Sequence, residues 1–263
     1  MSDSLDKLFS VQVFEHGEVS QREDYLSCEF PIAIEINGIT QAVMMATPQQ
    51  LEDFAVGFCL SEGIVDSANE IYGIEQEQRE QGIVLALEIA TQRQQQLAER
   101  RRHMAGRTGC GLCGIDSLDA IQTCDRVMTP QQRFNHAIIQ QAQVAFNNVD
   151  AAMLRSGTMH QASWINTTGE LRHLCLDVGR HNALDKLIGW RARQGVLDGF
   201  AMLSSRASHE LVEKCATVGI EMLVCVSGAT SLAVTRARHL NITLVGFARA
   251  GRHVVYAGNL DNQ

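Results

Sequence analysis

The chain has 263 residues, and its 22 Lys and Arg residues against 30 Asp and Glu residues give a formal charge of −8. Hydrophobic residues make up 45% of the chain, which is enough for a packed core and excludes a wholly disordered protein. The acidic balance argues against general nucleic-acid binding, because such binding needs a basic face.

Two further features concern location. No apolar run in the sequence reaches the roughly 18 residues that a membrane-spanning helix needs, so we expect no membrane association. The first six residues have neither the basic nor the apolar region of a signal peptide. We therefore expect a cytoplasmic protein, in which the eight cysteines stay reduced unless they have chemistry to perform.

The first part of the chain predicts a small α+β domain over residues 1–105. Residues 31–45 read as two strands around the Asn37-Gly38 turn, which suits a hairpin. Thr47 and Gln50 are expected to cap a helix that ends at Gly63. Strands over 71–75 and 83–89 and a polar helical stretch over 92–104 complete this part.

The second part of the chain has a different order of predicted elements. Strands and helices alternate, which predicts crossover connections and a largely parallel sheet. The expected strands are 171–178, 200–204, 222–226 and 243–247 with a short last strand at 254–256, and the expected helices are 182–193, 208–218 and 230–240. We thus expect a second domain over residues 127–263, joined to the first by a mobile loop over 106–126.

The loops that follow these strands are rich in Gly, Ser and Arg. In an open parallel sheet such loops meet at one edge, where ligands bind. Helix N-termini and arginines both favour phosphate, so four such loops predict a pocket for an anionic, nucleotide-like ligand. The loops are Gly179-Arg180, Ser205-Arg206, Ser227-Gly228 and Arg249-Ala250-Gly251-Arg252. Alternatively, these are ordinary polar crossover loops whose arginines pair with Asp177 and Asp185.

A glycine-rich segment over residues 107–118 carries Cys110 and Cys113. Arg107 and a helix beginning near Ser117 would both favour the thiolate form. Three chemistries are compatible with the pair: half of a zinc site shared across a dimer, a thioredoxin-like dithiol, or the carriage of sulfur as a persulfide. The residues alone do not favour the carriage of sulfur over the other two chemistries.

The segment from Thr108 to Gly114 closely resembles the signature loop of the FdhD family, the sulfur carrier proteins needed for formate dehydrogenase activity. The resemblance continues in separate blocks along most of the chain. These blocks are residues 44–48, 51–58, 61–64, 177–186, 204–208 and 243–247.

The resemblance implies a function. A family member accepts sulfur from a cysteine desulfurase as a persulfide and passes it to the molybdenum cofactor of formate dehydrogenase, bis-molybdopterin guanine dinucleotide. Cys110 matches the persulfide-bearing cysteine, and Cys113 matches its assisting neighbour. The segment taken to contact the cofactor matches Phe247, Ala248, Arg249, Ala250, Gly251 and Arg252. A chaperone that escorts this cofactor without transferring sulfur is the alternative.

The resemblance also implies a fold and an assembly. The expected fold is α/β, with a three-layer C-terminal domain similar to cytidine deaminases behind a smaller N-terminal domain, and the expected assembly is a homodimer. Gln161 and Ala162 follow His160 where a deaminase needs its zinc pattern, so we expect no deamination and no tightly held metal. Ala250 stands where some relatives have proline, and residues 156–160 lack a cysteine that some relatives have there. His160 and His181 are further candidate pocket residues.

Overall fold

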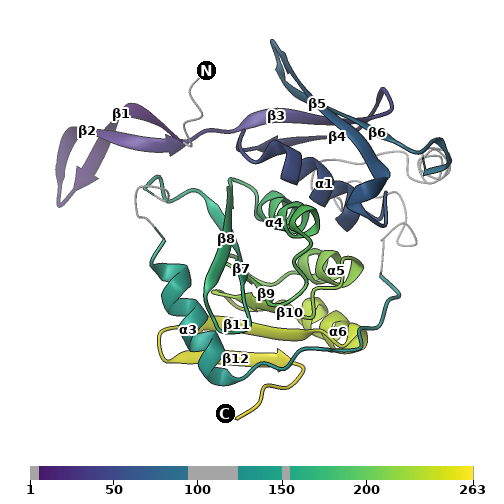
Figure 1. The fold of residues 1–263 in the computed structure, drawn as a ribbon. Helices are drawn as coiled ribbons and strands as arrows, with labels where there is room; N and C mark the ends of the chain where they lie inside the picture. Colours follow the sequence, from purple (N-terminus) through teal and green to yellow (C-terminus); the bar gives the residue numbers. More distant parts are fainter. Residues whose placement is uncertain (1–5, 94–123, 150–154, 263) are drawn as a thin grey trace.

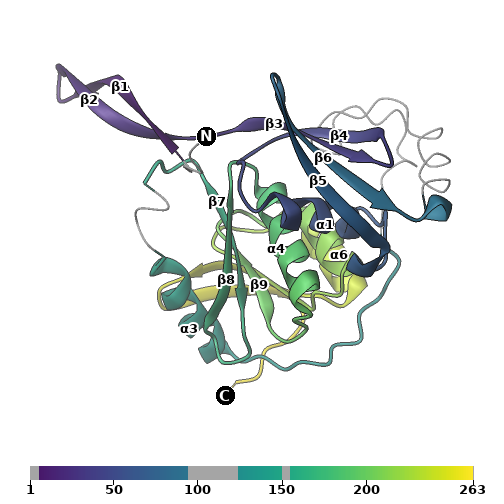
Figure 2. The ribbon, with the colours of Figure 1, turned by 45° about the horizontal axis from the view of Figure 1, so that its top comes forward.

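The strands of the protein form three sheets, which a computed structural model describes for residues 6–93, 124–149 and 155–262 (Figure 1). A two-stranded ribbon stands away from the body, a four-stranded sheet lies above one helix, and a six-stranded sheet forms the centre of the larger part (Figures 1 and 2). None of the described helices is long and apolar enough to cross a membrane.

The ribbon consists of β1 (Asp6–Glu15) and β2 (Glu18–Ser27), which pair antiparallel along their full length. His16 and Gly17, in the turn between them, both have positive φ angles of 52° and 91°, as the tightest hairpin turns require. The sequence analysis did not predict this ribbon. Most of its residues are exposed on both faces, and apolar and polar residues alternate only over the short stretch 9–13.

The four-stranded sheet has the order β4-β3-β6-β5. Its strands are β3 (Phe30–Ile36), β4 (Ile39–Ala46), β5 (Ile71–Arg79) and β6 (Gly82–Ile89). The predicted hairpin at Asn37-Gly38 is confirmed, and both turn residues have positive φ angles of 47° and 77°. Alternate residues of β3 point inward, so that Ile32, Ile34 and Ile36 are fully buried.

Helix α1 (Leu51–Ser61) packs under this sheet, and the short 3-10 helix η1 (Ala68–Glu70) follows it. The predicted end of α1 is confirmed, because Gly63 has a φ of 62° just beyond the last turn of that helix. The predicted start is wrong. Gln50 is the N-cap residue in a left-handed conformation and makes no capping bond, while the Thr47 hydroxyl accepts a bond from the Val178 N–H. Contacts with a distant strand therefore override the local capping signal.

The six-stranded sheet has the order β12-β11-β10-β9-β7-β8. Its strands are β7 (His160–Ile165), β8 (Leu171–Asp177), β9 (Phe200–Leu203), β10 (Met222–Cys225), β11 (Thr243–Arg249) and β12 (Arg252–Ala257). The sheet is mixed rather than largely parallel: β9, β10 and β11 pair in parallel, and the other neighbours pair antiparallel. The unpredicted strand β7 forms a hairpin with β8 and separates it from β9.

Helices cover both faces of this sheet, which gives the expected three layers (Figure 1). The helices are α3 (His136–Asn147), α4 (Arg180–Gln194), α5 (His209–Thr217) and α6 (Ser231–Leu240). Met202 and Val224 belong to the apolar cluster that contains α3 residues. Their strand neighbours Leu203 and Leu223 belong to the cluster that contains residues of α4, α5 and α6. The likeness to cytidine deaminases stays a prediction.

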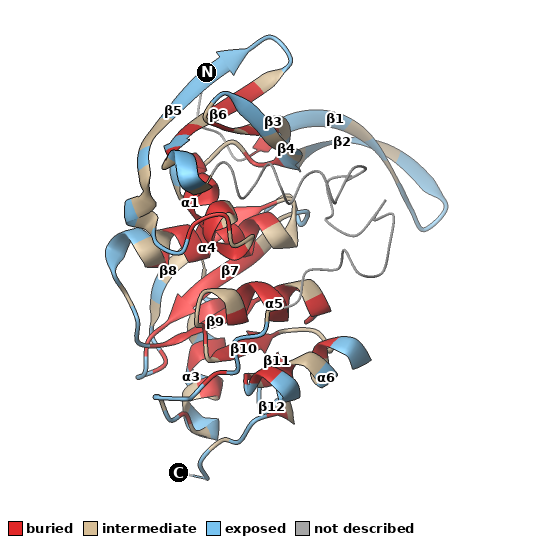
Figure 3. Ribbon diagram, turned by 90° about the vertical axis from the view of Figure 1, so that its right-hand side faces the viewer, coloured by how far each residue is buried: buried red, intermediate tan, exposed pale blue. Residues whose placement is uncertain are grey.

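Helices α1 and α4 join the two larger sheets into one core. A Cβ atom built on Gly57 of α1 would lie 1.7 Å from the Asp185 carbonyl oxygen of α4, and one built on Gly189 would lie 1.9 Å from the Asp53 carbonyl oxygen. Figure 3 shows buried residues running through both helices, and a single apolar cluster includes Ile34 of the smaller sheet and Leu223 of the larger one. The predicted domain boundary at residue 105 lies outside the described residues and stays a prediction.

Candidate functional site

The two cysteines of the predicted sulfur-carrying loop, Cys110 and Cys113, lie outside the described residues. The described chain is firmly held on either side of this gap. Arg93 forms ion pairs with Asp66 and Glu70. On the other side, the Cys124 N–H donates to the Glu213 carboxylate at 2.6 Å, and its carbonyl accepts a bond from Arg236 at 2.9 Å.

Four loops meet at one edge of the six-stranded sheet, as the sequence analysis predicted. β8 runs in the same direction as β9, β10 and β11, because β7 is antiparallel to both β8 and β9. The chain segments that follow these four strands therefore leave the sheet at the same edge. The predicted loops reach this edge even though the sheet is mixed.

Backbone hydrogen bonds extend the sheet into the loops after β9 and β10. The Ser227 N–H donates to the Ser205 carbonyl at 3.4 Å, and the Phe247 N–H donates to the Ser227 carbonyl at 3.0 Å. The Ala207 N–H in turn donates to the Gly228 carbonyl at 3.0 Å. These bonds hold the loops after β9 and β10 and the end of β11 side by side in a defined register.

The predicted cofactor segment, Phe247 to Arg252, begins inside β11 and forms the turn to β12. Phe247 has a φ of 49°, a left-handed conformation that is costly for a residue with a side chain. Its ring packs so closely on Gly228 that a Cβ atom there would lie 2.9 Å from the ring, and the Arg252 guanidinium lies 5.5 Å from the ring centroid. Ala248 is buried, whereas Arg249, Ala250, Gly251 and Arg252 are exposed.

The alternative prediction pairs the loop arginines with Asp177 and Asp185, but both of these carboxylates contact lysines. Asp177 lies 2.7 Å from the Nζ of Lys186, and both side chains are fully buried. Asp185 lies 2.9 Å from the Nζ of Lys214. Burial lowers the pKa of Lys214, but the nearby carboxylates of Asp185 and Glu62 outweigh this effect and raise it. These lysines balance the charge of the two aspartates within the core.

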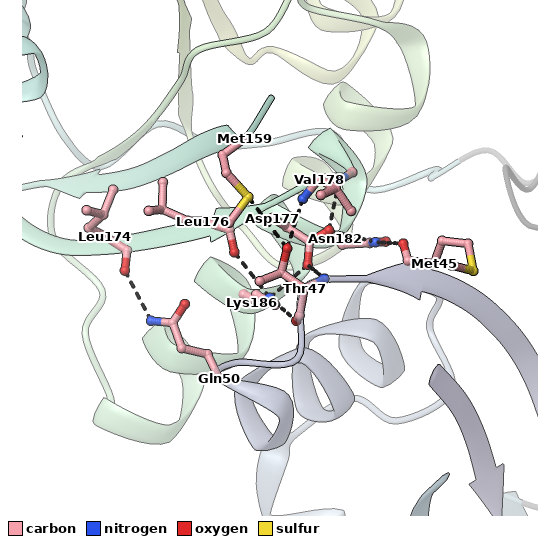
Figure 4. Close-up of polar contacts among 11 residues, drawn as sticks. Met45, Thr47, Gln50, Met159, Leu174, Leu176, Asp177, Val178, Asn182 and Lys186 are labelled. Atoms are coloured by element: carbon pink, nitrogen blue, oxygen red, sulfur yellow. Dashed lines mark hydrogen bonds and ion pairs between the residues drawn. The ribbon is translucent and has the colours of Figure 1, made fainter. Parts of the chain in front are cut away.

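Asp177 is the centre of a polar junction between the two sheets (Figure 4). Its carboxylate accepts bonds from the Thr47 N–H at 3.0 Å and from the Asn182 side chain at 3.0 Å. Lys186 donates to the carbonyls of Thr47 and Leu176 at 2.9 and 3.2 Å. The junction fixes the end of β8, and thereby the first loop of the edge, relative to α1.

His160 and His181 also lie at this edge, at the start of β7 and in the first turn of α4. Partial burial lowers the pKa of His160, and the charge of Arg180 lowers it further. His181 lies 3.8 Å from Glu210, and its contact holds the pKa of that carboxyl well below its usual range. The two histidines therefore lie in different surroundings, since His160 is affected by the charge of Arg180 and His181 faces the Glu210 carboxylate.

Three residues that the sequence did not reveal support the cofactor segment. Gln140 and His136 of α3 and His253 of β12 form a hydrogen-bonded chain behind the turn that contains Gly251. The only signal in the sequence was the four-residue spacing of His136 and Gln140, which places both on one face of a helix. Among the described residues, no group of three or more His, Cys, Asp or Glu side chains is arranged to hold a metal ion.

Comparisons with known proteins agree with one another. A model of the FdhD/NarQ family matches residues 27–261. A protein of Cupriavidus necator named sulfur carrier protein FdhD is 45% identical over 251 residues, which cover 95% of this chain and 87% of that protein. A crystal structure described as a formate dehydrogenase accessory protein from Desulfotalea psychrophila has a TM-score of 0.71, covers 97% of both chains and is 21% identical, which shows a shared fold.

Proposed function

The chain belongs to the FdhD/NarQ family, and from this premise we propose that it is a sulfur carrier in the maturation of formate dehydrogenase. It accepts sulfur from a cysteine desulfurase as a persulfide on Cys110, and it transfers that sulfur to the molybdenum cofactor that formate dehydrogenase requires. The observation that carries the proposal is the 45% identity, over 95% of the chain, to a protein named as a sulfur carrier.

The loading step is a sulfurtransferase-type exchange between thiols. The Cys110 thiolate attacks the outer sulfur of a persulfide on the desulfurase, a new S–S bond forms on Cys110, and the donor cysteine leaves as a thiolate. No net oxidation takes place, because one S–S bond replaces another. Cys113 assists as the neighbouring thiol, and this role is a proposal like that of Cys110.

The sheet edge is the proposed binding site for the cofactor, bis-molybdopterin guanine dinucleotide, which is cargo in this reaction. Its pyrophosphates require cationic and N–H donors, which Arg206, Arg249 and Arg252 supply from exposed positions. Its guanines require flat apolar surfaces, and the ring of Phe247 is one. The residues at the edge therefore fit an anionic ligand that carries aromatic bases.

The assembly and fold proposals follow from the same family. We propose a homodimer in the cytoplasm and a C-terminal part of the cytidine-deaminase-like type, with a desulfurase as donor and formate dehydrogenase as recipient. The ribbon β1–β2 supports an assembly, since Phe14 and Val19 near its tip remain exposed by 71% and 66%. A two-stranded ribbon is at best marginally stable alone, so a partner that covers it would stabilise it.

The decisive experiment measures persulfide formation. The purified protein is incubated with a cysteine desulfurase and cysteine, and its intact mass is determined before and after reduction. We expect a reducible gain of one sulfur atom that maps to Cys110 and is absent from Cys110→Ala. Cys124→Ala, which removes a thiol outside the signature loop, is the matched control and retains the gain.

The cofactor chaperone remains the second candidate, favoured by the arginine-rich edge. It predicts the reverse pattern: formate dehydrogenase maturation is lost in Arg252→Ala and nearly unchanged in Cys110→Ala. A protein with accessible thiols that gains no sulfur would exclude the carrier and leave the chaperone.

A further inference from the structure

The turn between β11 and β12 is held from behind by one side chain of α3. The Gly251 N–H donates to the Oε1 atom of Gln140 at 2.8 Å. The oxygen is the only acceptor on a glutamine amide, so this bond fixes the orientation of the whole group. The Nε2 atom of Gln140 must then face His253, whose Nδ1 atom lies 3.0 Å away.

This orientation determines where the protons of two histidines lie. The Gln140 NH₂ group can only donate, so the Nδ1 of His253 is its acceptor and carries no proton. The proton of neutral His253 is therefore on Nε2, which lies 2.7 Å from the Nδ1 of His136 and donates to it. His136 in turn carries its proton on Nε2. The two rings stack with centroids 4.9 Å apart.

A proton added to the histidine pair breaks the bond between Gln140 and His253. If either ring becomes charged, the shared N–H···N bond still holds one proton, and the outer nitrogen of each ring holds another. The Nδ1–H of His253 then points at the NH₂ group of Gln140, and two donors cannot bond. Gln140 can bond to His253 again only by turning its oxygen toward it, which leaves the Gly251 N–H without that acceptor.

Burial and the proximity of the two rings oppose protonation of the pair. Helix α3 carries no titratable side chain other than His136. The turn contributes two cations, Arg249 and Arg252, and the last segment contributes the anion Asp261, whose backbone carbonyl accepts the backbone N–H of His136 at 3.4 Å. Burial lowers the pKa of His253, and the proximity of His136 lowers it further. The bond to Gly251 is thus intact at neutral pH and is lost when the pair takes up a proton at lower pH.

We propose that Gln140, His253 and His136 form a proton-sensitive latch that positions the turn of the cofactor segment for its anionic ligand. All three are positioning residues, because they act through the backbone of Gly251. The inference rests on the proposed function only for the identity of that ligand. The latch itself is a property of the hydrogen bonds and can be measured in the free protein.

The first test follows the histidine rings and the Gly251 amide of the whole chain by NMR during a pH titration. We expect His253 to be protonated on Nε2 at neutral pH, and the Gly251 amide to shift in step with protonation of the pair. In Gln140→Glu, one carboxylate accepts from both the Gly251 N–H and a protonated His253. This variant should therefore raise the pKa of His253 and remove the coupled shift. A Gly251 amide that ignores the histidine titration in the wild-type protein would overturn the latch.

The second test uses guanosine diphosphate as a minimal probe for the proposed cofactor site. Gln140→Ala should weaken its binding several-fold at about pH 7.5, and the ratio between variant and wild type should approach one at a pH where the NMR titration shows the histidine pair to be protonated. Taking this ratio cancels the attraction of a charged histidine for the probe. Gln141→Ala, on the exposed side of the same helix, is the control and should leave the ratio near one at both values.

The outcomes separate the two proposals. An equal loss of affinity at both pH values would show that Gln140 is merely structural. If the wild-type protein fails to bind the probe at either pH, the proposed cofactor contact fails, and the NMR titration still decides whether the latch exists.

Discussion

Gly57 and Gly189 allow the backbones of α1 and α4 to approach closely. Each faces a carbonyl oxygen of the opposite helix at a distance that no Cβ atom tolerates. Both opposing groups belong to helix backbone, so neither can move aside as a flexible side chain could. These two residues therefore determine how near the smaller sheet lies to the larger one.

Gly57→Ala should destabilise the protein by at least about 1–3 kcal/mol, the usual cost of overpacking a well-filled core. The free energy of unfolding in urea measures this effect. Gly73→Ala is the matched control: its Cβ atom would meet only the end of the Glu88 side chain at 3.7 Å, so the stability should barely change. Equal stability of the two variants would contradict the close packing.

Residue-level prediction succeeded where the cause is local. Asn37-Gly38 and Gly63 could be predicted because positive φ angles select these residue types whatever surrounds them. Thr47 could not, because its backbone and hydroxyl bond to residues about 130 positions later in the chain. The chain of Gln140, His253 and His136 was missed for the same reason, since its members come from α3 and β12.

At the scale of elements, the base of the ribbon β1–β2 is tied to the body by a few polar contacts. Arg155 forms two bonds of 2.7 Å with the carboxylate of Asp6 and lies 3.6 Å above the ring of Tyr25. The hydroxyls of Ser27 and Ser156 lie 2.6 Å apart. The ribbon thus depends on this base for its orientation.

Arg155→Ala should increase hydrogen exchange in the ribbon and leave exchange in β9 and β10 unchanged. The bond from Arg155 lowers the pKa of Asp6, so its stabilising effect is fully present above the ordinary aspartate pKa of 3.8 and is lost as the pH falls below it. The exchange rate of the variant relative to that of the wild-type protein should therefore increase by the same factor at about pH 6 and pH 8. A difference between these two conditions would show that another group controls the base.

Elements with a strong pattern were predicted, and those without one were missed. The helices and strands from β8 to β12 alternate clearly, and their existence is confirmed. Strand β7 lies between β8 and β9 with all but its first residue buried, and its buried polar residues Gln161 and Ser163 interrupt the apolar run that is typical of such a strand. Because β7 was not predicted from the sequence, the expected sheet was largely parallel rather than mixed.

At the scale of the whole molecule, one apolar cluster spans both larger sheets, and the buried junction around Asp177 lies between them. Parts that share a core unfold together, because neither can lose its packing while the other keeps its own. The two predicted domains should therefore not behave as independent units.

Calorimetry of the full chain should show one heat-absorption peak whose calorimetric and van't Hoff enthalpies agree. Lys186→Met, which leaves Asp177 without its buried cation, should shift this single peak to lower temperature without splitting it. Two separate peaks in the wild-type protein would instead support independent domains.

The candidate site was predictable in outline. The four loops share one edge because β8 keeps the direction of the parallel strands, although a strand that the sequence did not reveal separates it from them. Cys110 and Cys113 lie outside the described residues, so their roles stay predictions. The bonds that align the loops could not be predicted, because they depend on register between strands distant in sequence.

Because the backbone of Phe247 is left-handed, we expect two different selection experiments to favour different residues at this position. Glycine would relieve a strain of about 1 kcal/mol or more, so a library screened for thermal survival should enrich Phe247→Gly. A library screened for formate dehydrogenase maturation should retain phenylalanine, since glycine discards the ring on which Gly228 and Arg252 pack. If both screens favour glycine, the strained ring has no part in the function.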